Sequence, residues 1–225
     1  MRHAVVTGTS SGIGRAVAAR LLDHGCRVTG LDQSPATLEH ERFRELPVDL
    51  ADGNGRARAL ADLGAADALV HCAGIMRGAR LGELDFDAGA LLWRIHVEAG
   101  AALANHLAPG MGAGGRIVLV GSRASLGAIG KSQYAAAKSA LVGMAKSWAK
   151  ELAARGITVN VVAPASTETA MLGDPQRSDT PPAALPPIGR RIQPEEVAAL
   201  VAFLLSPEAA AITGQEIHIC GGSSL

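Results

Sequence analysis

The strongest constraint on the fold is the regular alternation of short β-branched runs with longer stretches rich in Ala and Leu. Such alternation is typical of βαβ units, in which helices join parallel strands and cover the sheet. We expect strands at Ala4–Thr7, Arg27–Leu31, Glu45–Asp49, Ala68–Cys72, Arg116–Gly121, Thr158–Ala163 and Glu216–Ile219. We expect helices at Gly12–His24, Gly53–Leu63, Asp87–Ala108, Ser132–Ala154 and Pro194–Leu205. The pattern predicts an α/β fold with a parallel sheet of about seven strands and helices on both faces.

Length and charge narrow the function classes. At 225 residues the chain suits a single domain, so we treat residues 1–225 as one unit. Lys plus Arg and Asp plus Glu number 21 each, which argues against nucleic acid and anionic membranes as partners. The three cysteines are scattered without metal-ligand spacing, and the histidines show none either, so we predict no metal site. With a strand at the N-terminus instead of a signal peptide, we expect a cytoplasmic protein.

A glycine-rich turn joins the first predicted strand to the first helix. Its glycines allow a tight turn and close backbone approach, and the N-terminus of the helix offers unpaired N–H groups to a pyrophosphate. Strand before and helix after is the context in which such a motif indicates a Rossmann-type, doubly wound sheet. The expected cofactor-binding residues of this turn are Gly8, Ser10, Ser11, Gly12, Ile13 and Gly14.

Asp32 closes the second predicted strand, eighteen residues after Gly14. A carboxylate there can accept hydrogen bonds from the adenosine ribose hydroxyls and would repel a 2′-phosphate. No basic residue follows it at Gln33, and position 9 is Thr. We therefore predict NAD in preference to NADP; the alternative is a solvated turn aspartate.

The only tyrosine of the chain, Tyr134, stands four residues before Lys138. Residues four apart on a helix lie on the same face, so the ammonium of Lys138 would lie beside the phenol of Tyr134. There it would favour the phenolate and lower the pKa of the phenol. Tyr134 is therefore a candidate proton donor and acceptor, although such pairs also occur on ordinary helix surfaces. The remaining unassigned segment, residues 170–191, is rich in proline and is either a substrate lid or a surface loop.

Together these residues resemble the short-chain dehydrogenase/reductase family over essentially the whole chain. The glycine motif from Thr7 to Gly14 has the family's spacing, Tyr134 and Lys138 match its Tyr-x-x-x-Lys, and Ser122 matches its upstream serine. The resemblance adds further expected cofactor contacts, at Asp49, Leu50, Cys72, Ala73, Gly74, Tyr134, Lys138, Pro164, Thr167 and Thr169. It also implies a substrate loop at about residues 170–191.

The family mechanism implies a role for each member of the triad. Tyr134 would exchange the hydroxyl proton of an alcohol while hydride moves between its carbon and the nicotinamide. Ser122 would hydrogen-bond the substrate oxygen and stabilise the charge that develops on it. Lys138 would lower the pKa of the phenol and hold the nicotinamide ribose.

Two departures from the family pattern stand close to the expected site. His71 and Cys72 replace an Asn-Asn pair, which leaves the polar contacts of the central strands open. His96 stands where the family commonly has an asparagine that holds a water for proton transfer. A histidine could take this role because it donates, accepts and titrates near neutrality; the alternative is a packed helical histidine.

The main hypothesis is an NAD-dependent enzyme that interconverts a small-molecule secondary alcohol and a ketone. Members of the family act on acyl-chain ketones, sugars and polyols, steroids and cyclic diols, and the sequence does not choose among them. Asp32 argues against a 3-oxoacyl-thioester reductase, since that step usually draws on NADPH. The alternative is a non-catalytic NAD(H)-binding sensor or interaction module. The family's usual assembly predicts a homotetramer, or a homodimer, with the helices at Asp87–Ala108 and Ser132–Ala154 in an interface.

Overall fold

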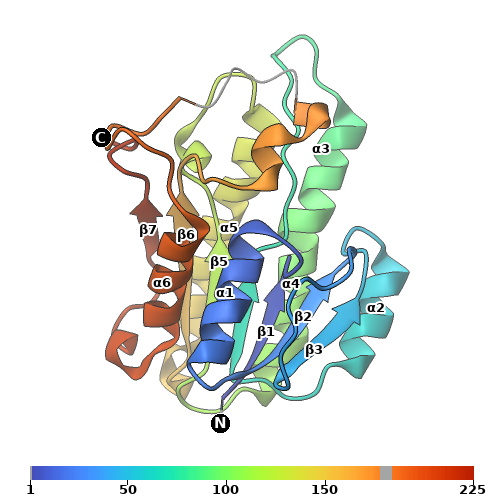
Figure 1. The fold of residues 1–225 in the computed structure, drawn as a ribbon, viewed down its shortest axis with the longest axis vertical. Helices are drawn as coiled ribbons and strands as arrows, with labels where there is room; N and C mark the ends of the chain where they lie inside the picture. Colours follow the sequence, from blue (N-terminus) through green and yellow to red (C-terminus); the bar gives the residue numbers. More distant parts are fainter. Residues whose placement is uncertain (1, 178–183) are drawn as a thin grey trace.

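A seven-stranded parallel sheet forms the centre of the protein (Figure 1). The computed structural model describes residues 2–177 and 184–225. The strands are β1 (His3–Thr7), β2 (Arg27–Asp32), β3 (Phe43–Pro47), β4 (Ala68–His71), β5 (Arg116–Val120), β6 (Thr158–Pro164) and β7 (Glu216–Ile219), in the order β3-β2-β1-β4-β5-β6-β7. Every adjacent pair is parallel. The predicted fold class, a single doubly wound domain, is confirmed.

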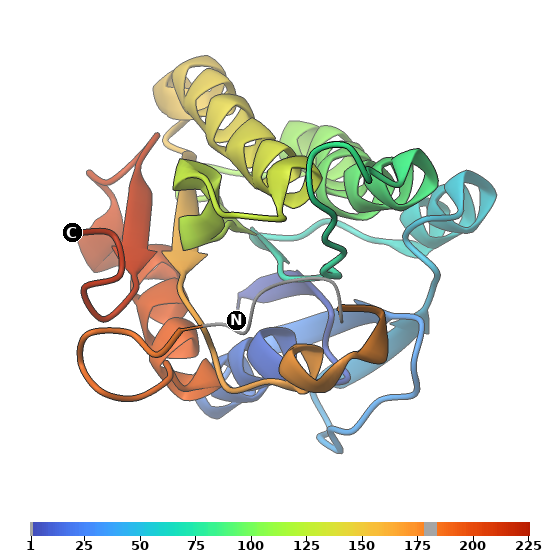
Figure 2. The same cartoon turned by 90° about the horizontal axis from the view of Figure 1, so that it is seen from above.

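Helices cover both faces of the sheet (Figure 2). They are α1 (Gly12–Asp23), α2 (Gly53–Asp62), α3 (Phe86–Trp93), α4 (Ala99–Leu107), α5 (Ser132–Leu152) and α6 (Pro194–Leu205). Helices α1 and α6 pack on one face, where residues such as Val17 and Val201 join the core. Helices α2, α4 and α5 pack on the other through residues such as Ala59, Leu103 and Leu141. Because both faces are covered, the central strands are almost wholly apolar and buried.

The long helix predicted at Asp87–Ala108 is interrupted. A π-helical turn, Arg94–Glu98, separates α3 from α4 and carries His96. A π turn adds a residue to the helical repeat and often marks a functional site. The apolar periodicity predicts a helix here but does not reveal the wider turn. The other differences are shifts at element ends, such as β3, which spans Phe43–Pro47 instead of Glu45–Asp49.

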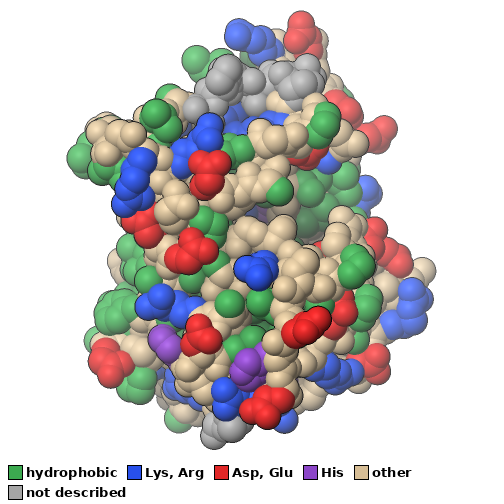
Figure 3. All heavy atoms as spheres, viewed as in Figure 1, with side chains coloured by type: hydrophobic (Ala, Val, Ile, Leu, Met, Phe, Trp, Pro, Cys, Tyr) green, Lys and Arg blue, Asp and Glu red, His purple; other side chains and the backbone are tan. Residues whose placement is uncertain are grey.

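The order of the strands places the binding crevice. Chain progression reverses between β1 and β4, which lie side by side with Thr7 opposite His71. In open parallel sheets, ligands bind outside the carboxyl ends of the strands at such a switch point. Among residues 2–177 and 184–225, no helix is long and apolar enough to cross a membrane. On the face in Figure 3, acidic and basic side chains are interspersed.

Candidate active site

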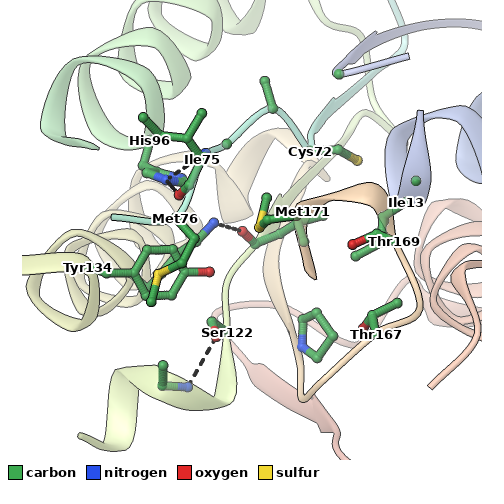
Figure 4. A pocket seen from close by; sticks show the side chains of 18 of the residues that line it. Ile13, Cys72, Ile75, Met76, His96, Ser122, Tyr134, Thr167, Thr169 and Met171 are labelled. Atoms are coloured by element: carbon green, nitrogen blue, oxygen red, sulfur yellow. Dashed lines mark hydrogen bonds between the residues drawn. The ribbon is translucent and has the colours of Figure 1, made fainter. Parts of the chain in front are cut away.

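A cavity of about 830 Å³ lies at the carboxyl ends of the central strands. This volume is within the range of small-molecule and cofactor sites. The cavity brings together Ser122, Tyr134, Lys138 and His96 with almost all the residues expected to bind the cofactor; Ser10 is the exception, since it does not line the cavity itself. Figure 4 shows Ser122, Tyr134 and His96 converging from separate elements.

The glycine turn after β1 requires glycine by geometry. Gly8 and Gly12 have φ angles of 75° and 53°, which side chains rarely adopt. A Cβ on Gly14 would lie 2.1 Å from the carbonyl oxygen of Gly8, so only glycine allows α1 to approach the turn. The side chain of Ser11, the residue that precedes α1, makes no capping hydrogen bond. The first N–H groups of α1 are therefore available to an anionic ligand, and the turn fits a pyrophosphate.

Asp32 organises the glycine turn as well as lining the cavity. One carboxylate oxygen accepts from the backbone N–H of Ser10 and the other from that of Ser34, each at 3.0 Å. The Ser10 hydroxyl donates to the Ser34 carbonyl at 2.8 Å. Ser10 therefore shapes the site through this tie to β2. Each carboxylate oxygen retains a lone pair for a ligand hydroxyl. At the same end, Asp49 is exposed and Leu50 is buried.

The side chain of His71 supplies polar contacts between the central strands, at the position where the family has an Asn-Asn pair. The Thr7 hydroxyl oxygen accepts from the N–H groups of Cys72 and Ala73, at 3.0 and 2.9 Å. Its proton therefore points to Nδ1 of His71 at 2.9 Å, and Nε2–H of His71 donates to the Ile95 carbonyl at 3.1 Å. Burial lowers the pKa of His71 to about 4, so the ring is neutral. The histidine thus ties β1 and β4 to the π turn.

Gly74 and Cys72 complete this wall of the cavity. A Cβ on Gly74 would lie 2.3 Å from the ring of His96, so the strand end and the π turn can meet only at glycine. The thiol of Cys72 faces the cavity, and burial raises its pKa to about 12. A thiol that stays protonated is a packing group here, not a nucleophile.

Ser122, Tyr134 and Lys138 come from two adjacent elements. Ser122 follows β5, and its hydroxyl oxygen accepts from the Ala124 N–H at 3.1 Å at the start of a short 3-10 helix. Tyr134 lies in the first turn of α5, and Lys138 follows one turn later. The Nζ of Lys138 donates to the Val120 carbonyl at 2.8 Å and lies 5.7 Å from the centre of the phenol ring. The predicted shared face is confirmed.

The electrostatics of the phenol differ from the expectation. Burial raises the pKa of Tyr134 above its ordinary value, and a hydrogen bond from Ser122 and the charge of Arg177 oppose that effect. Burial also lowers the pKa of Lys138 to about 7, which weakens its charge near neutrality. The prediction that Lys138 lowers the pKa of the phenol is therefore wrong for this form of the protein, in which Arg177 is the cation that acts on it.

His96 is buried between the phenol and the β4 loop. Its Nε2 lies 2.9 Å from the Ile75 carbonyl oxygen and 3.3 Å from the Ile75 N–H (Figure 4). The shorter contact is to an oxygen that can only accept, so we assign the ring proton to Nε2. Its ring meets the ring of Tyr134 edge-on, with centroids 5.6 Å apart. Burial, followed by the charge of Lys138, holds its pKa well below the ordinary value, so the prediction that His96 titrates near neutrality is wrong. Its Nδ1 is a buried acceptor without a partner among the described residues.

The segment after β6 forms the remaining wall. Thr167 is buried and its hydroxyl donates to the Ala165 carbonyl at 3.0 Å, while the Thr169 methyl faces Gly12. Of the predicted substrate loop, Met171 and Leu185 line the cavity, and residues 178–183 lie outside the described part. Within that described part, no three His, Cys, Asp or Glu residues are placed to hold a metal.

Several lining residues lacked a sequence signal. Arg123, Lys131 and Arg177 reach the cavity only because a 3-10 turn, a loop and the segment after β6 converge there. Ile75, which also lines the cavity, acts through its backbone carbonyl, which bonds the ring of His96. Short motifs do not encode such contacts, although the position of Lys131 three residues before Tyr134 could have suggested one.

Comparison with known proteins agrees with this geometry. The family model described as Enoyl-(Acyl carrier protein) reductase matches residues 8–224. A 3-oxoacyl-[acyl-carrier-protein] reductase of Vibrio cholerae is 37% identical over 97% of this chain and 96% of its own. The chain belongs to the short-chain dehydrogenase/reductase family. It is an NAD(P)-dependent oxidoreductase that acts on CH–OH groups.

Two further relatives span similar chemistry. The cis-4-hydroxycyclohexanecarboxylate dehydrogenase of Sinomonas cyclohexanicum is 37% identical over 98% of this chain and 96% of its own. A blue fluorescent protein from a metagenomic library, solved in complex with NADPH, is 30% identical, with a TM-score of 0.87 and coverage of 100% of this chain and 98% of that one.

Proposed function

We propose that this protein interconverts a small secondary alcohol and a ketone by hydride transfer with NAD. The observation that carries the proposal is the convergence of Ser122, Tyr134 and Lys138 in the cavity that begins at the glycine turn. A bound nicotinamide would supply the hydride chemistry, and the protein supplies position, electrostatics and the proton.

Tyr134 is the general acid and base in this proposal. It gives its proton to the ketone oxygen in reduction and takes the hydroxyl proton in oxidation. Ser122 lies beside it and donates a hydrogen bond to the same substrate oxygen, which stabilises the negative charge that develops there. Lys138, fixed by its bond to the Val120 carbonyl, lies beneath the phenol, where it can hold a ribose hydroxyl and pass protons.

His96 is proposed to hold a water on the proton path behind Tyr134. Its Nδ1 is a buried acceptor that needs a donor, and its ring lies against the phenol. Because the ring stays neutral, it would act by accepting a hydrogen bond and not by taking up the proton. The alternative is a packed histidine whose only role is the tie to Ile75.

The preference for NAD rests on Asp32. Its carboxylate is fixed at the ribose end of the cavity by two backbone N–H groups and would repel a 2′-phosphate. One similar protein is solved with NADPH, so the proposed preference depends on Asp32 and not on membership of the family. The 3-oxoacyl substrate in the names of many relatives remains a competing substrate class.

Assembly and location complete the proposal. The chain would form a homotetramer or homodimer through α3, α4 and α5, and it would act in the cytoplasm. Trp93 on α3 is 45% exposed, which a partner subunit would cover. Light scattering that gives a monomer would contradict the assembly.

The test is Tyr134→Phe, because it removes one oxygen atom and keeps the ring. Absorbance at 340 nm would follow NADH or NADPH with a panel of secondary alcohols, polyols, hydroxy acids and 3-hydroxyacyl thioesters, and with the matching ketones. We expect turnover with NAD and a fall in kcat of roughly 10²–10⁴-fold in the variant. NADH binding, measured by fluorescence, should stay within about twofold. Equal activity in the two proteins would refute the mechanism, whereas NADH binding without turnover on the panel would favour the sensor hypothesis.

A further inference from the structure

The segment at residues 169–177 forms one wall of the cavity. At its start, the side chain of Thr169 lies against Gly12 of the glycine turn. Farther along, Met171 and Leu172 line the cavity, and Figure 4 shows Met171 reaching into it. The segment consists largely of two short 3-10 helices, which lie outside the sheet and have poorer hydrogen-bond geometry than an α-helix. Its position therefore depends on contacts made by side chains.

Arg77, on the loop after β4, provides such contacts from another part of the molecule. Its Nη1 donates to Oδ2 of Asp174 at 2.7 Å, forming an ion pair between residues 97 positions apart. Its Nη2 donates to the side-chain oxygen of Gln176. Nη1 also donates to the carbonyl of Met76, a buried residue that lines the cavity, at 2.7 Å. One guanidinium therefore connects the wall at Met76 with the segment at residues 169–177.

The pair of Arg77 and Asp174 differs from an ordinary surface ion pair. The two side chains are 18% and 28% exposed, so water screens their charges only in part. The other carboxylate oxygen, Oδ1, accepts from the N–H of Gln176 at 2.9 Å, which fixes the direction of the carboxylate. This N–H is the chief cause that lowers the pKa of Asp174, and the bond from Arg77 adds to it, so the carboxylate is charged at neutral pH. The carboxylate is therefore both oriented and ionised for the guanidinium.

We propose that Arg77 is a positioning residue for the reaction. It holds the segment at residues 169–177 against the β4 loop, so that Met171 and Leu172 keep their place in the wall that encloses cofactor and substrate. Arg77 is not itself among the described residues that line the cavity, so it acts through the segment that it holds. The inference rests on the proposed function, because it adds a residue to the machinery of the same site.

The position of this segment affects both ligands. Its start contacts the glycine turn, where the pyrophosphate is expected, and Met171 and Leu172 face the rest of the cavity. When the pair of Arg77 and Asp174 is broken, the segment is free to leave the wall. Opening of such segments controls ligand release in many enzymes, and the apparent dissociation constant rises as the fraction of protein with the segment in place falls. The pair therefore slows cofactor release and lowers KM for the substrate.

The first test needs no ligand. Backbone hydrogen exchange, followed by mass spectrometry, compares wild type with Arg77→Met and Asp174→Asn. The single oxygen of the asparagine can still accept from the N–H of Gln176, so this variant keeps the local turn and loses the ion pair. Both variants should speed exchange in peptides from residues 169–177 by about tenfold, the value of one hydrogen bond to a charged group. Arg80→Met, which removes an exposed cation of the same loop, should exchange as wild type. Unchanged exchange in both variants would overturn the proposal.

The second test asks whether the held position matters for the ligands. Stopped-flow fluorescence gives the rate of NADH release, and steady-state kinetics with the alcohol found in the panel gives KM and kcat. Arg77→Met should release NADH about tenfold faster and raise KM about tenfold, while kcat stays the same or rises. The double variant of Arg77→Met with Asp174→Asn should be no worse than either single variant, because all three lack the same pair. Additive losses, or a fall in kcat with KM unchanged, would contradict a role through this pair.

A third protein separates this proposal from the proposed function. Tyr134→Phe should keep the wild-type exchange in residues 169–177, and NADH release from it should still quicken about tenfold when Arg77→Met is added. If both hold but Tyr134→Phe is fully active, the mechanism is refuted and the role of Arg77 stands. If Tyr134→Phe is inactive but Arg77→Met leaves exchange and NADH release unchanged, the mechanism stands and the role of Arg77 is refuted.

Discussion

The two ends of the cavity are built on different principles. At the end formed by the glycine turn, where the adenosine of the cofactor is proposed to bind (the adenosine end), the site is shaped by backbone: positive φ angles, a missing Cβ at Gly14 and N–H groups at the start of α1. At the reacting end, it is shaped by buried side chains that carry shifted pKa values, chiefly Tyr134, Lys138 and His96. The first end depends on shape and the second on solvation and charge.

This difference predicts how each end responds to substitution and to pH. A backbone cradle responds to added atoms and is insensitive to pH. A set of buried titratable groups keeps its shape under conservative substitution but responds to any change in protonation. His71 lies where the two ends meet, since it bonds Thr7 on the glycine side and the Ile95 carbonyl of the π turn. The following predictions test the contrast in order of expected effect.

The largest effect should come from Gly14→Ala. The new Cβ would lie 2.1 Å from the Gly8 carbonyl oxygen, a contact that forces the turn and α1 apart. Overpacking of this kind costs about 1–3 kcal/mol and more where backbone must move. We expect the free energy of unfolding to fall by about 3 kcal/mol and NADH binding to weaken by more than about tenfold. Urea unfolding and a fluorescence titration measure the two.

Gly64→Ala is the matched control, because a Cβ there would meet nothing within 4 Å. It should keep both unfolding and NADH binding within error of wild type. If Gly14→Ala also binds NADH normally, the adenosine end is not shaped by close backbone approach and the contrast fails.

The second prediction concerns acid stability at the junction. The pKa of His71 is about 4 in the folded protein, because burial lowers it from the ordinary value of 6.5. Between these values the unfolded chain binds a proton that the folded chain does not, so stability falls as pH falls. The loss amounts to about 3 kcal/mol and is complete near pH 4. His96 adds to it in the same direction.

The variant His71→Asn isolates the contribution of His71 to the loss of stability in acid. Its amide can accept a hydrogen bond from Thr7 and donate one to the Ile95 carbonyl, but it does not titrate. Its unfolding free energy should fall less than that of wild type from pH 7 to pH 4.5, by about 2 kcal/mol. His24→Asn, at an exposed position, should retain the wild-type slope. Identical slopes in all three proteins would show that the neutral form of His71 is not what the fold requires.

The sequence predicted the adenosine end better than the reacting end. The reason is that the first depends on backbone shape and the second on solvation and charge. Glycines and their spacing are visible in a sequence, so the turn from Gly8 to Gly14 and the strand–helix order followed directly. The triad was also visible, because Ser122, Tyr134 and Lys138 match the motifs of the short-chain dehydrogenase/reductase family. The pKa directions were not, since desolvation depends on all the segments that pack around a group. The π turn at Arg94–Glu98 was not predicted, because the apolar residues there keep the spacing of an ordinary helix.

The smallest effect should come from Asp32→Asn, which changes charge at the end built by backbone. The substitution removes the repulsion of a 2′-phosphate and one strong acceptor for ribose hydroxyls, so kcat/KM should fall about tenfold with NAD and rise with NADP. Part of the loss has a second source. The carboxylate accepts from both Ser10 and Ser34, and an amide can satisfy only one of them with its single oxygen. Asp62→Asn, exposed at the end of α2, controls for net charge and should leave the cofactor ratio unchanged. A tenfold loss with both cofactors would mean that Asp32 acts only by holding the turn. Cofactor binding at the adenosine end would then depend on backbone shape alone, and other residues would determine the choice between NAD and NADP.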